Sequence, residues 1–520
     1  MNNLAALVLA SAIVILVWRK WSSSKRQLPL PPGPRRKWFI GNLLDFPTTR
    51  PWLAFRDWSN EHGNLLFIDL PFRPIIVIGS AKVANDLLDN RSTIYSGRPY
   101  SVMMELVGSY WSFVLMPYNS IWRTQRRYFH DYFSRSAVQD YQTIQLQETH
   151  TVLVRMLESP EQAQKWIRNL PGSSIIRVVY GARNATQMRH YIYLAERGLE
   201  AARKALVPGA FLAELIPIMK HIPSWLPGGA ARRFAAEYRP IVAEMRDRAF
   251  DEVKEAMANG KAVPSVASRL IEDLQDEAGN LTEEADEIVR GISAVAYGTA
   301  ADTTTASSEA FMVAMAMYPD VQRRGQAELD RIVGPSRLPD FNDLDSLVYV
   351  RAIMMETLRW MPTVPVGVAH QLDEDDIYEG YHIPKGSVVI ANIWAMLHDP
   401  DDYPEPDIFR PERFLDKHGN IDTSVRDPIN IAFGFGRRVC AGNEFALSVL
   451  NIFMASMLHV YEIKPGVDVS GQPVTLTSEG SDEAISSPMT FPRHIKPRSP
   501  HAEQLVREIV LSEDFADVAT

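Results

Sequence analysis

The chain of 520 residues is 46% hydrophobic and 22% charged, the balance of an ordinary folded globular protein. Its formal net charge of −9 gives no reason to expect nucleic acid as a partner, and its single cysteine excludes an internal disulfide. By its length alone, the chain would be expected to form roughly three domains of ~150 residues. However, no Gly/Ser-rich linker, repeat or low-complexity tract separates such domains in the sequence. One large domain with an N-terminal extension fits better.

The extension comprises residues 1–27. An uncharged apolar run from Leu4 to Trp18 is followed by four basic residues, Arg19, Lys20, Lys25 and Arg26. The run is short for a membrane span of ~20 residues, and a secretory signal peptide is the alternative. Because the basic residues lie only on the C-terminal flank, the positive-inside rule keeps that flank in the cytosol. We therefore expect a retained single-pass anchor and a cytosolic body.

The remaining chain divides into a spacer and a body. Prolines in 28–37 predict a stiff, non-helical hinge, after which the body occupies 38–520. Short β-type runs lie at 65–79 and 387–392. Helical patterns cover 120–157, 185–205, 232–258, 281–317, 319–333, 347–360 and 443–460. These elements predict a mainly α fold with a minor β-sheet.

The predicted helix 281–317 carries polar residues in an Ala-rich middle. Thr282 is a suitable N-cap, and acidic residues follow it in the first turn. Asp302, Thr303 and the two threonines after them lie halfway along. A solvated polar face would explain them, but apolar residues on both sides favour an interior cavity, where unpartnered polar groups are costly.

Two charged motifs lie nearer the C-terminus. Glu356 and Arg359 are three residues apart on a predicted helix, a spacing that on the surface contributes only a few tenths of a kcal/mol. Arg413 lies in a later Pro-containing loop and has the planar fork needed to join them. A three-membered charge cluster is the prediction.

Cys440 lies among glycines and arginines, just before the predicted helix 443–460. An inert buried cysteine is the simplest alternative, but a thiol near a helix N-terminus and beside arginines is expected to have a lowered pKa. A thiolate acts as a nucleophile or a metal ligand, and without a second cysteine a Cys-rich zinc site is excluded. A single thiolate suits the axial position of haem iron.

The loop around this thiol resembles the haem-binding signature of the cytochrome P450 monooxygenases, F-x-x-G-x-R-x-C-x-G. The residues that match are Phe433, Gly436, Arg438, Cys440 and Gly442. Four motifs occur in the family's order, so the resemblance covers essentially the whole chain. The anchor and hinge are similar to those of microsomal members, and more loosely the chain resembles fungal members of specialised metabolism.

Other motifs carry the same resemblance. Glu356 and Arg359 match the family's E-x-x-R, and Arg413 falls in its "PERF" element. Trp122 and Arg126 match W-x-x-x-R, whose side chains usually contact a haem propionate. His370 stands where the family often has a second propionate partner.

The resemblance implies the chemistry of the protein. It implies haem b with Cys440 as the axial ligand of iron, and Asp302 and Thr303 as the residues that guide protons during oxygen activation. One departure is Ala300, which replaces the glycine common in the family's central helix and slightly narrows the groove. Since the chain has no Gly-rich dinucleotide fingerprint or flavin domain, electrons would come from NADPH through a separate cytochrome P450 reductase, with cytochrome b5 as an optional second donor. The expected location is the endoplasmic reticulum membrane.

Alternatives remain open. A haem-thiolate isomerase or dehydratase would need no reductase, but the retained Asp302–Thr303 pair counts against it. A haem carrier or sensor would need no proton relay, and a thiol hydrolase would need a nearby histidine base. Segments expected to line the pocket are largely apolar and predict a lipophilic substrate, first a terpenoid and second an aromatic polyketide or indole. These segments are 100–116, 205–225, 363–367 and 484–489.

Overall fold

The computed structural model describes residues 28–71, 73–182, 184–206, 210–468 and 470–509. The chain folds into two compact units, each built from segments far apart in the sequence. The first contains the described residues up to Pro99, Val366–Met396 and Phe435–Arg438, and the second contains Tyr100–Pro365, Leu397–Gly434 and the chain from Val439 on. The single domain over 38–520 stays a prediction. The predicted anchor, 1–27, lies outside the described residues.

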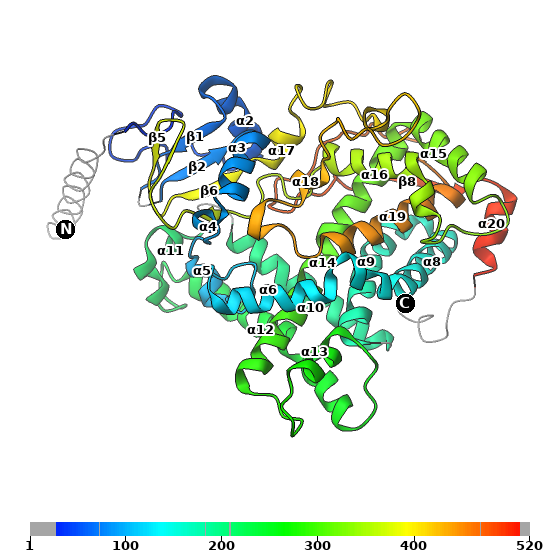
Figure 1. Ribbon diagram of the computed structural model, residues 1–520, viewed down its shortest axis with the longest axis horizontal. Helices are drawn as coiled ribbons and strands as arrows, with labels where there is room; N and C mark the ends of the chain where they lie inside the picture. The colour runs from blue at the N-terminus through cyan, green and yellow to red at the C-terminus, as the bar shows by residue number, and fades with distance from the viewer. Residues whose placement is uncertain (1–27, 72, 183, 207–209, 469, 510–520) are drawn as a thin grey trace. The chain divides into compact units, whose positions relative to one another are not determined.

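The first unit is built on a four-stranded sheet, in which the predicted β-type runs are confirmed (Figure 1). β1 pairs antiparallel with β2, β2 pairs parallel with β6, and β6 pairs antiparallel with β3. Phe55, on the neighbouring helix α2, packs with side chains of the sheet such as Leu66 and Val77. The strands are β1 (Leu65–Ile68), β2 (Ile75–Ile78), β3 (His370–Gln371) and β6 (Val388–Ala391). The other elements are α2 (Pro51–His62), α3 (Ala81–Ala84), η1 (Asn85–Asn90), α4 (Ser92–Tyr95), β4 (Asp376–Tyr378), β5 (Tyr381–Ile383), η7 (Gly436–Arg438) and the start of α17 (Ile393–Leu397).

The proline-rich segment 28–37 is attached to this unit. The Phe67 backbone N–H donates to the Pro32 carbonyl at 2.8 Å, and the His382 N–H donates to the Pro29 carbonyl at 2.8 Å. A Cβ on Gly33 would overlap the Phe67 carbonyl oxygen, so the close approach requires glycine there. From Pro29 onward the segment is therefore fixed against strands β1 and β5.

The second unit is helical, with one two-stranded antiparallel sheet, β7–β8. Its longer helices are α6 (Ser120–Phe133), α8 (Gln142–Glu158), α9 (Ala163–Tyr180), α10 (Ala185–Ala205), α12 (Ala230–Ala258), α13 (Val266–Leu274), α14 (Glu283–Met317), α15 (Pro319–Ile332), α16 (Val348–Trp360), α19 (Asn443–Val460) and α20 (Pro500–Arg507). Its shorter elements are α5 (Val102–Val107), α7 (Arg135–Val138), η2 (Gln139–Tyr141), η3 (Pro160–Gln162), α11 (Leu212–Leu215), η4 (Pro217–His221), η5 (Leu344–Ser346), η6 (Pro411–Phe414), α18 (Ile429–Ala432), β7 (Tyr461–Pro465) and β8 (Arg493–Pro497).

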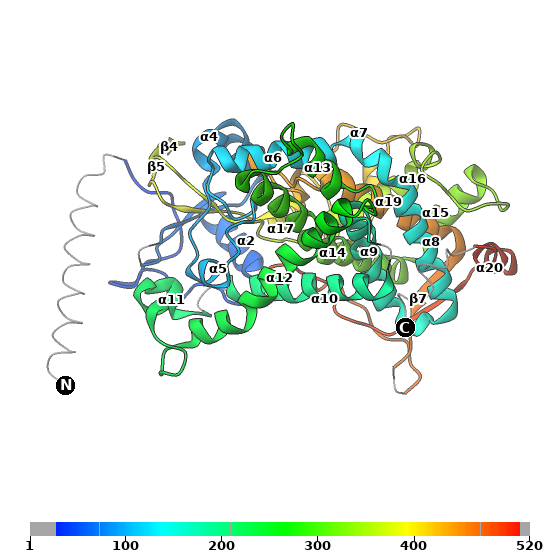
Figure 2. The same cartoon turned by 90° about the horizontal axis from the view of Figure 1, so that it is seen from below.

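The long helix α14 runs through the centre of this unit. The predicted N-cap is confirmed, because the Thr282 side chain accepts a hydrogen bond from the Ala285 N–H and acidic residues fill the first turn. Figure 1 shows α9 and α19 alongside α14, and Figure 2 shows α10 and α12 beside it. Most residues of α14 are buried, chiefly between Gly291 and Ala316. Polar groups on this helix are therefore held inside the unit and need partners.

The predicted helical pattern over 120–157 is confirmed, but the structure divides it into several helices. α6 ends at Phe133, and Ser134 is extended, with φ −65° and ψ 164°. A short turn of α7 and η2 then leads into α8, which begins at Gln142. Ser134 has no breaker signature in the sequence, and the apolar periodicity continues across it, so the pattern alone does not reveal the bend.

Helix α9 was not predicted, because Pro171 and Gly172 lie in its middle and read as a break. In the structure both residues are buried within a continuous helix. Gly172 lies beside Ala301 on α14, and a Cβ there would make only an ordinary contact, 3.9 Å from the Ala301 Cβ. Packing against α14 outweighs the local preference.

Helix α19, which follows the cysteine loop, is apolar along its whole length. Among the described residues it is the one helix long and apolar enough to cross a membrane, and about two thirds of it is buried inside the fold. This burial is typical of a core helix of a globular unit. The match in length and composition therefore adds nothing to the prediction of an anchor at residues 1–27.

Candidate active site

The loop from Phe433 to Gly442 is closed by a backbone hydrogen bond. The Cys440 N–H donates to the Phe433 carbonyl at 2.8 Å. Gly436 has a φ of 59°, and a Cβ there would overlap the Leu88 carbonyl oxygen, so glycine is required. In contrast, a Cβ on Gly434 or Gly442 would meet no described atom within 4 Å. Gly434, with a φ of 80°, and Gly436 thus bend the loop, and Gly434 and Gly442 leave room beside it.

Cys440 stands at the end of this loop, three residues before α19 begins. Its side chain is exposed at the surface, although many protein atoms lie around the thiol. The resulting burial raises the pKa of the thiol, although the Gly442 backbone N–H and the charge of Arg126 act in the opposite direction. The expectation of a lowered pKa is therefore wrong for the protein groups alone, because desolvation outweighs the nearby charge. A bound metal ion deprotonates a coordinating thiol outright.

Helix α6 places Trp122 and Arg126 one turn apart on its inner side. The Trp122 indole N–H donates to the Phe113 carbonyl at 3.0 Å, which fixes the start of the helix. The Arg126 guanidinium donates through Nη2 to the Val439 carbonyl, next to Cys440. Two residues that the sequence places 313 positions apart are thereby joined.

His370 and Arg438 both lie in the first unit, around the backbone of Tyr95 and Ser96. His370 Nδ1 donates to the Tyr95 carbonyl at 2.8 Å, and Arg438 Nε donates to the Ser96 carbonyl at 2.9 Å. Burial and the positive charges of Arg98 and Arg438 lower the pKa of His370 to about 3. The imidazole is therefore neutral near pH 7, with the proton on Nδ1, because a carbonyl only accepts.

Arg98 is a further member of this basic group that the sequence analysis missed. Its Nη1 donates to the carbonyls of Val368 at 2.8 Å and Ala369 at 2.7 Å, immediately before His370. The only signal for it in the sequence is its position before Pro99, which carries no chemical meaning by itself. Its link to strand β3 depends on folding over 270 residues.

Thr303 and Asp302 lie in the middle of α14 with different environments. The Thr303 side chain is half-buried, and its hydroxyl donates to the Thr299 carbonyl at 3.0 Å. Thr305 makes the same bond to Ala301 at 2.7 Å. Such bonds to the preceding turn are usual for threonine in helices and leave the oxygen lone pairs free to accept another proton donor.

Asp302 is buried, with 8% of its surface exposed, and it faces two arginines from other helices. Arg203 Nη1 on α10 lies 2.8 Å from Oδ2, and Arg168 Nη2 on α9 lies 3.4 Å from Oδ1. These arginines were missed by the sequence analysis. Both lie on helices with exposed charged residues, where an arginine is ordinary, so the sequence contains no signal that separates them from surface residues.

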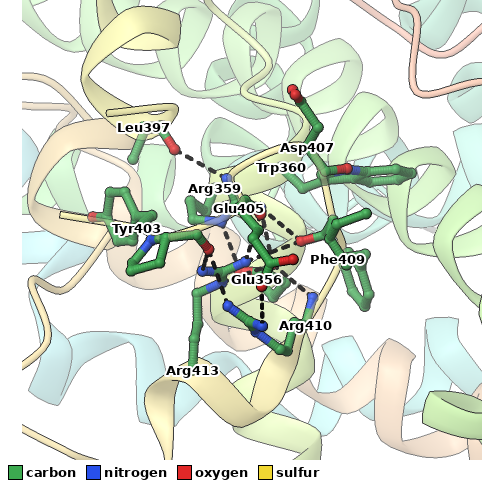
Figure 3. Close-up of polar contacts among 12 residues, drawn as sticks. Glu356, Arg359, Trp360, Leu397, Tyr403, Glu405, Asp407, Phe409, Arg410 and Arg413 are labelled. Carbon is green, nitrogen blue, oxygen red and sulfur yellow. Dashed lines mark hydrogen bonds and ion pairs between the residues drawn. The ribbon is translucent and has the colours of Figure 1, made fainter. Parts of the chain in front are cut away.

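Glu356, Arg359 and Arg413 form a buried charge cluster (Figure 3). Arg359 donates to the Glu356 carboxylate through Nε at 2.7 Å and Nη2 at 2.9 Å, and Arg413 donates through Nε at 3.1 Å. The Arg410 backbone N–H adds a fourth bond at 2.8 Å. Since Glu356 and Arg359 are both fully buried, the cluster is a lock between α16 and the loop that ends in η6.

The chain matches known proteins over most of its length. The family model described as Cytochrome P450 matches residues 31–479. The chain belongs to the cytochrome P450 family.

Curated relatives of this cytochrome P450 are similar over nearly the whole chain. Cytochrome P450 monooxygenase COX1 of Coprinopsis cinerea is 38% identical over 512 residues, covering 96% of this chain and 99% of its own. Cytochrome P450 monooxygenase ple1 of Rhodocybe pseudopiperita is 38% identical over 511 residues, covering 98% and 97%. Cytochrome P450 monooxygenase claR of Ampulloclitocybe clavipes is 36% identical over 497 residues, covering 95% and 91%.

The family establishes the class of chemistry. The protein is an oxidoreductase that uses a haem with a thiolate ligand, takes electrons from a redox partner and acts as a monooxygenase on O2 and a substrate. The residues present fit such a group, because the one thiol of the chain is exposed and both flanking glycines leave space for a flat ligand. The mainly helical fold with small sheets is the fold expected of the family.

Proposed function

We propose that this cytochrome P450 inserts one oxygen atom of O2 into a lipophilic small molecule, with a terpenoid of fungal secondary metabolism as the first candidate. The observation that carries the proposal is the exposed thiol of Cys440 at the end of a closed, glycine-bent loop. The test is to supply terpenoid, aromatic polyketide and indole scaffolds to cells that express the protein with a reductase. Oxygenated terpenoids support the proposal, and products from the aromatic scaffolds alone contradict the substrate class.

We assign the residues that hold the cofactor from their chemistry and from the family motifs. Cys440 would supply the thiolate ligand of iron, while the open space beside Gly434 and Gly442 would admit the porphyrin next to Phe433. Haem ligated by a thiolate supplies the oxygen activation that no side chain offers. By the family motifs, the basic side chains Arg126, His370 and Arg438 are each candidates to meet an acidic propionate, and Trp122 fixes the helix that carries Arg126. A bound anion would raise the pKa of His370, because it favours the charged form of the imidazole.

Asp302 and Thr303 are the proposed proton-handling pair. Asp302 holds a buried negative charge between two arginines, and the Thr303 hydroxyl can accept one proton donor while it donates to Thr299. A carboxylate beside a hydroxyl can pass protons through ordered water toward the substrate side of α14. The neighbouring Ala300 adds a methyl group to this face, which restricts substrate shape.

Thr303→Ala should uncouple electron use from product formation. The variant keeps the backbone hydrogen bonds of α14, so it should still bind substrate and accept electrons. Proton delivery becomes too slow, however, and the electrons reduce O2 to hydrogen peroxide instead of forming product. A general acid–base contribution is ~10²–10⁴-fold, and water partly replaces the missing hydroxyl, so we expect a marked fall in product formed per NADPH consumed. The matched control is Thr305→Ala, which loses the same kind of backbone bond. Equal coupling in parent and Thr303→Ala would remove the relay role.

The redox partner is proposed to be an NADPH–cytochrome P450 reductase, with cytochrome b5 as an optional second donor. Helix α6 exposes Arg123, Arg127 and His130 on one face, at a spacing of four and three residues. This basic face stands out in a chain of net charge −9 and suits an acidic partner surface. It lies on the same helix as Arg126, which bonds next to Cys440.

A lipophilic substrate agrees with how two predicted pocket segments, 100–116 and 205–225, are joined. Ser101 Oγ donates to Glu214 at 2.6 Å, and the Met103 N–H donates to the same oxygen at 2.8 Å. Beneath these bonds an apolar cluster from α5, α10, α11 and α12 includes Met104 and Tyr238. The segments therefore meet over apolar side chains, which suit a ligand of the same character.

The protein is proposed to lie on the endoplasmic reticulum membrane, with residues 1–27 as a single-pass anchor and the body in the cytosol. Large apolar side chains between 212 and 225 are exposed, and they suit contact with lipid. They are Leu212, Ile216, Ile218 and Trp225, the last 78% exposed.

Deleting residues 1–27 should release much of the protein from membranes and leave haem binding intact. The described part of the chain starts at Leu28, and the bonds of Pro29 and Pro32 to the first unit are kept. The measurement is the share of protein in the membrane pellet, together with the carbon monoxide spectrum of the soluble fraction. Residual attachment through the exposed 212–225 side chains is expected. Secretion of the full-length chain with processing would contradict the anchor.

A further inference from the structure

The Asp302 carboxylate belongs to a larger charge network in the second unit. Arg203, its nearer partner, has a second carboxylate within reach, because its Nε lies 3.6 Å from Oε2 of Glu483. The Asp302 side chain is 8% exposed and that of Glu483 is 58% exposed. One guanidinium thus connects a buried acid on α14 with a carboxylate at the surface.

Glu483 lies in a compact loop, 480–488. The loop is closed by the Ser481 N–H, which donates to the Ser487 carbonyl at 2.8 Å. Its Ser486 N–H donates to the Thr363 carbonyl at 2.8 Å. Thr363 Oγ1 in turn lies 3.0 Å from Ser307 Oγ, which is on α14 five residues after Asp302. The loop is therefore joined to α14 both through Arg203 and through Thr363.

The two bonds of Arg203 differ in strength for a physical reason. The bond to Asp302 is shorter and lies in a poorly hydrated place, whereas water screens the bond to the exposed Glu483. At rest Arg203 is therefore held mainly by Asp302. Arg168 holds the other oxygen of Asp302 at 3.4 Å and is itself held by Glu196 at 2.8 Å. A displacement of loop 480–488 would therefore change how Arg203 is shared between Asp302 and Glu483. Arg168 has no ion pair to the loop in the described structure and would stay in place.

We propose that Arg203 is a positioning residue that orients Asp302 and transmits to it the position of loop 480–488. The loop includes most of the 484–489 segment that the sequence predicts to line the substrate pocket, so a substrate that shifts the loop also shifts the acid. The proposal rests on the proposed role of Asp302 in proton handling. Substrates of different shape then differ in how completely electrons are converted into product.

The first experiment compares Arg203→Gln, Arg203→Lys and Asp302→Asn with the parent, all as holoprotein with the parent's carbon monoxide spectrum. The control is Arg197→Gln, a variant on the same helix α10 as Arg203. It loses ion pairs to Glu200 on α10 and to Glu237 on α12. We expect Arg203→Gln to lower product formed per NADPH by about tenfold, less than the ~10²-fold of a 1 Å misplacement, because Arg168 still holds Asp302. Arg203→Lys restores most of the loss, and Arg197→Gln changes nothing.

The second experiment measures hydrogen exchange of loop 480–488 without turnover. In Asp302→Asn the Arg203 guanidinium is released toward Glu483, so exchange in the loop slows by about one-and-a-half- to fivefold, the range of an exposed ion pair. In Arg203→Gln exchange becomes faster by a similar factor. The proposal is overturned if the hydrogen exchange rate of loop 480–488 is unchanged in both variants. It is also overturned if Arg203→Gln forms as much product per NADPH as the parent while Asp302→Asn forms less. If Asp302→Asn forms as much product per NADPH as the parent, the proposed role of Asp302 in proton handling is wrong. The hydrogen exchange result then still tests whether Arg203 connects Asp302 to loop 480–488.

Discussion

We expect Cys440→Ala to abolish the red-shifted absorption band that the reduced protein gives with carbon monoxide, and with it all monooxygenase activity. The chain has one cysteine, so no second thiolate can take its place. The loss is qualitative, because the band requires a thiolate as ligand of the haem. Cys440→His should retain haem with a shifted band, since imidazole also ligates haem iron.

The control separates loss of the ligand from loss of the fold. Cys440 is exposed, and its loop is closed by a backbone bond to Phe433 that alanine preserves, so the variant should keep the parent's circular dichroism. The measurements are the reduced carbon monoxide spectrum, haem content and the far-ultraviolet spectrum of each variant. A parental band in Cys440→Ala would show that the ligand is another group, and the haem-thiolate assignment of this loop would be abandoned.

Much of the helical framework follows from local signals. Helix α14 starts at Glu283, directly after its N-cap Thr282, and ends at Met317, two residues before Pro319, the first residue of α15. Strands β1 and β2 are short β-branched and apolar runs that the sequence marks clearly. These elements are predictable because each depends on residues within one or two turns of itself.

The missing helix α9 depends on distant residues. Pro171 and Gly172 favour a break, but the helix stays continuous where it packs against α14. The division between α6 and α8 at Ser134 has the opposite cause, since the local pattern is helical and the path of the chain bends there. In both cases tertiary packing determines where the helix continues or ends, and the apolar periodicity of the sequence carries no information about that packing.

In the candidate site, too, the sequence indicates some residues by their type and position but does not indicate which residues contact them. Asp302 could be named from the sequence because a carboxylate in an Ala-rich helix interior is unusual, but Arg168 and Arg203 could not, since arginines on amphipathic helices are common. His370 could be named from its position, although its neutral state depends on burial and on Arg98. The sequence therefore identifies the reactive groups, and the structure identifies the groups that hold them.

Glu356→Ala should give little holoprotein and a strongly destabilised fold. Its carboxylate accepts from Arg359 and Arg413 and from the Arg410 backbone N–H, so its removal leaves two buried guanidinium groups without a counter-charge. Breaking one side of a buried ion pair costs about 3–5 kcal/mol, a large part of the ~5–15 kcal/mol that stabilises a typical protein. Arg359→Ala should cost a similar amount, because it leaves the buried carboxylate short of two of its four hydrogen bonds.

Two further variants distinguish the buried charge from its hydrogen bonds and from surface ion pairs. Glu356→Gln keeps an acceptor oxygen but no charge, so its stability should lie between the parent and Glu356→Ala. Glu405→Gln is the matched control in the same cluster (Figure 3), since the Glu405 side chain pairs with Arg410 at 2.7 Å but is 67% exposed. Its loss should cost less than about 1 kcal/mol. The measurements are denaturant unfolding and haem content per protein. If Glu356→Ala unfolds at the same denaturant concentration as Glu405→Gln, the cluster is an ordinary surface contact, and the lock between α16 and the η6 loop contributes nothing to holding the fold.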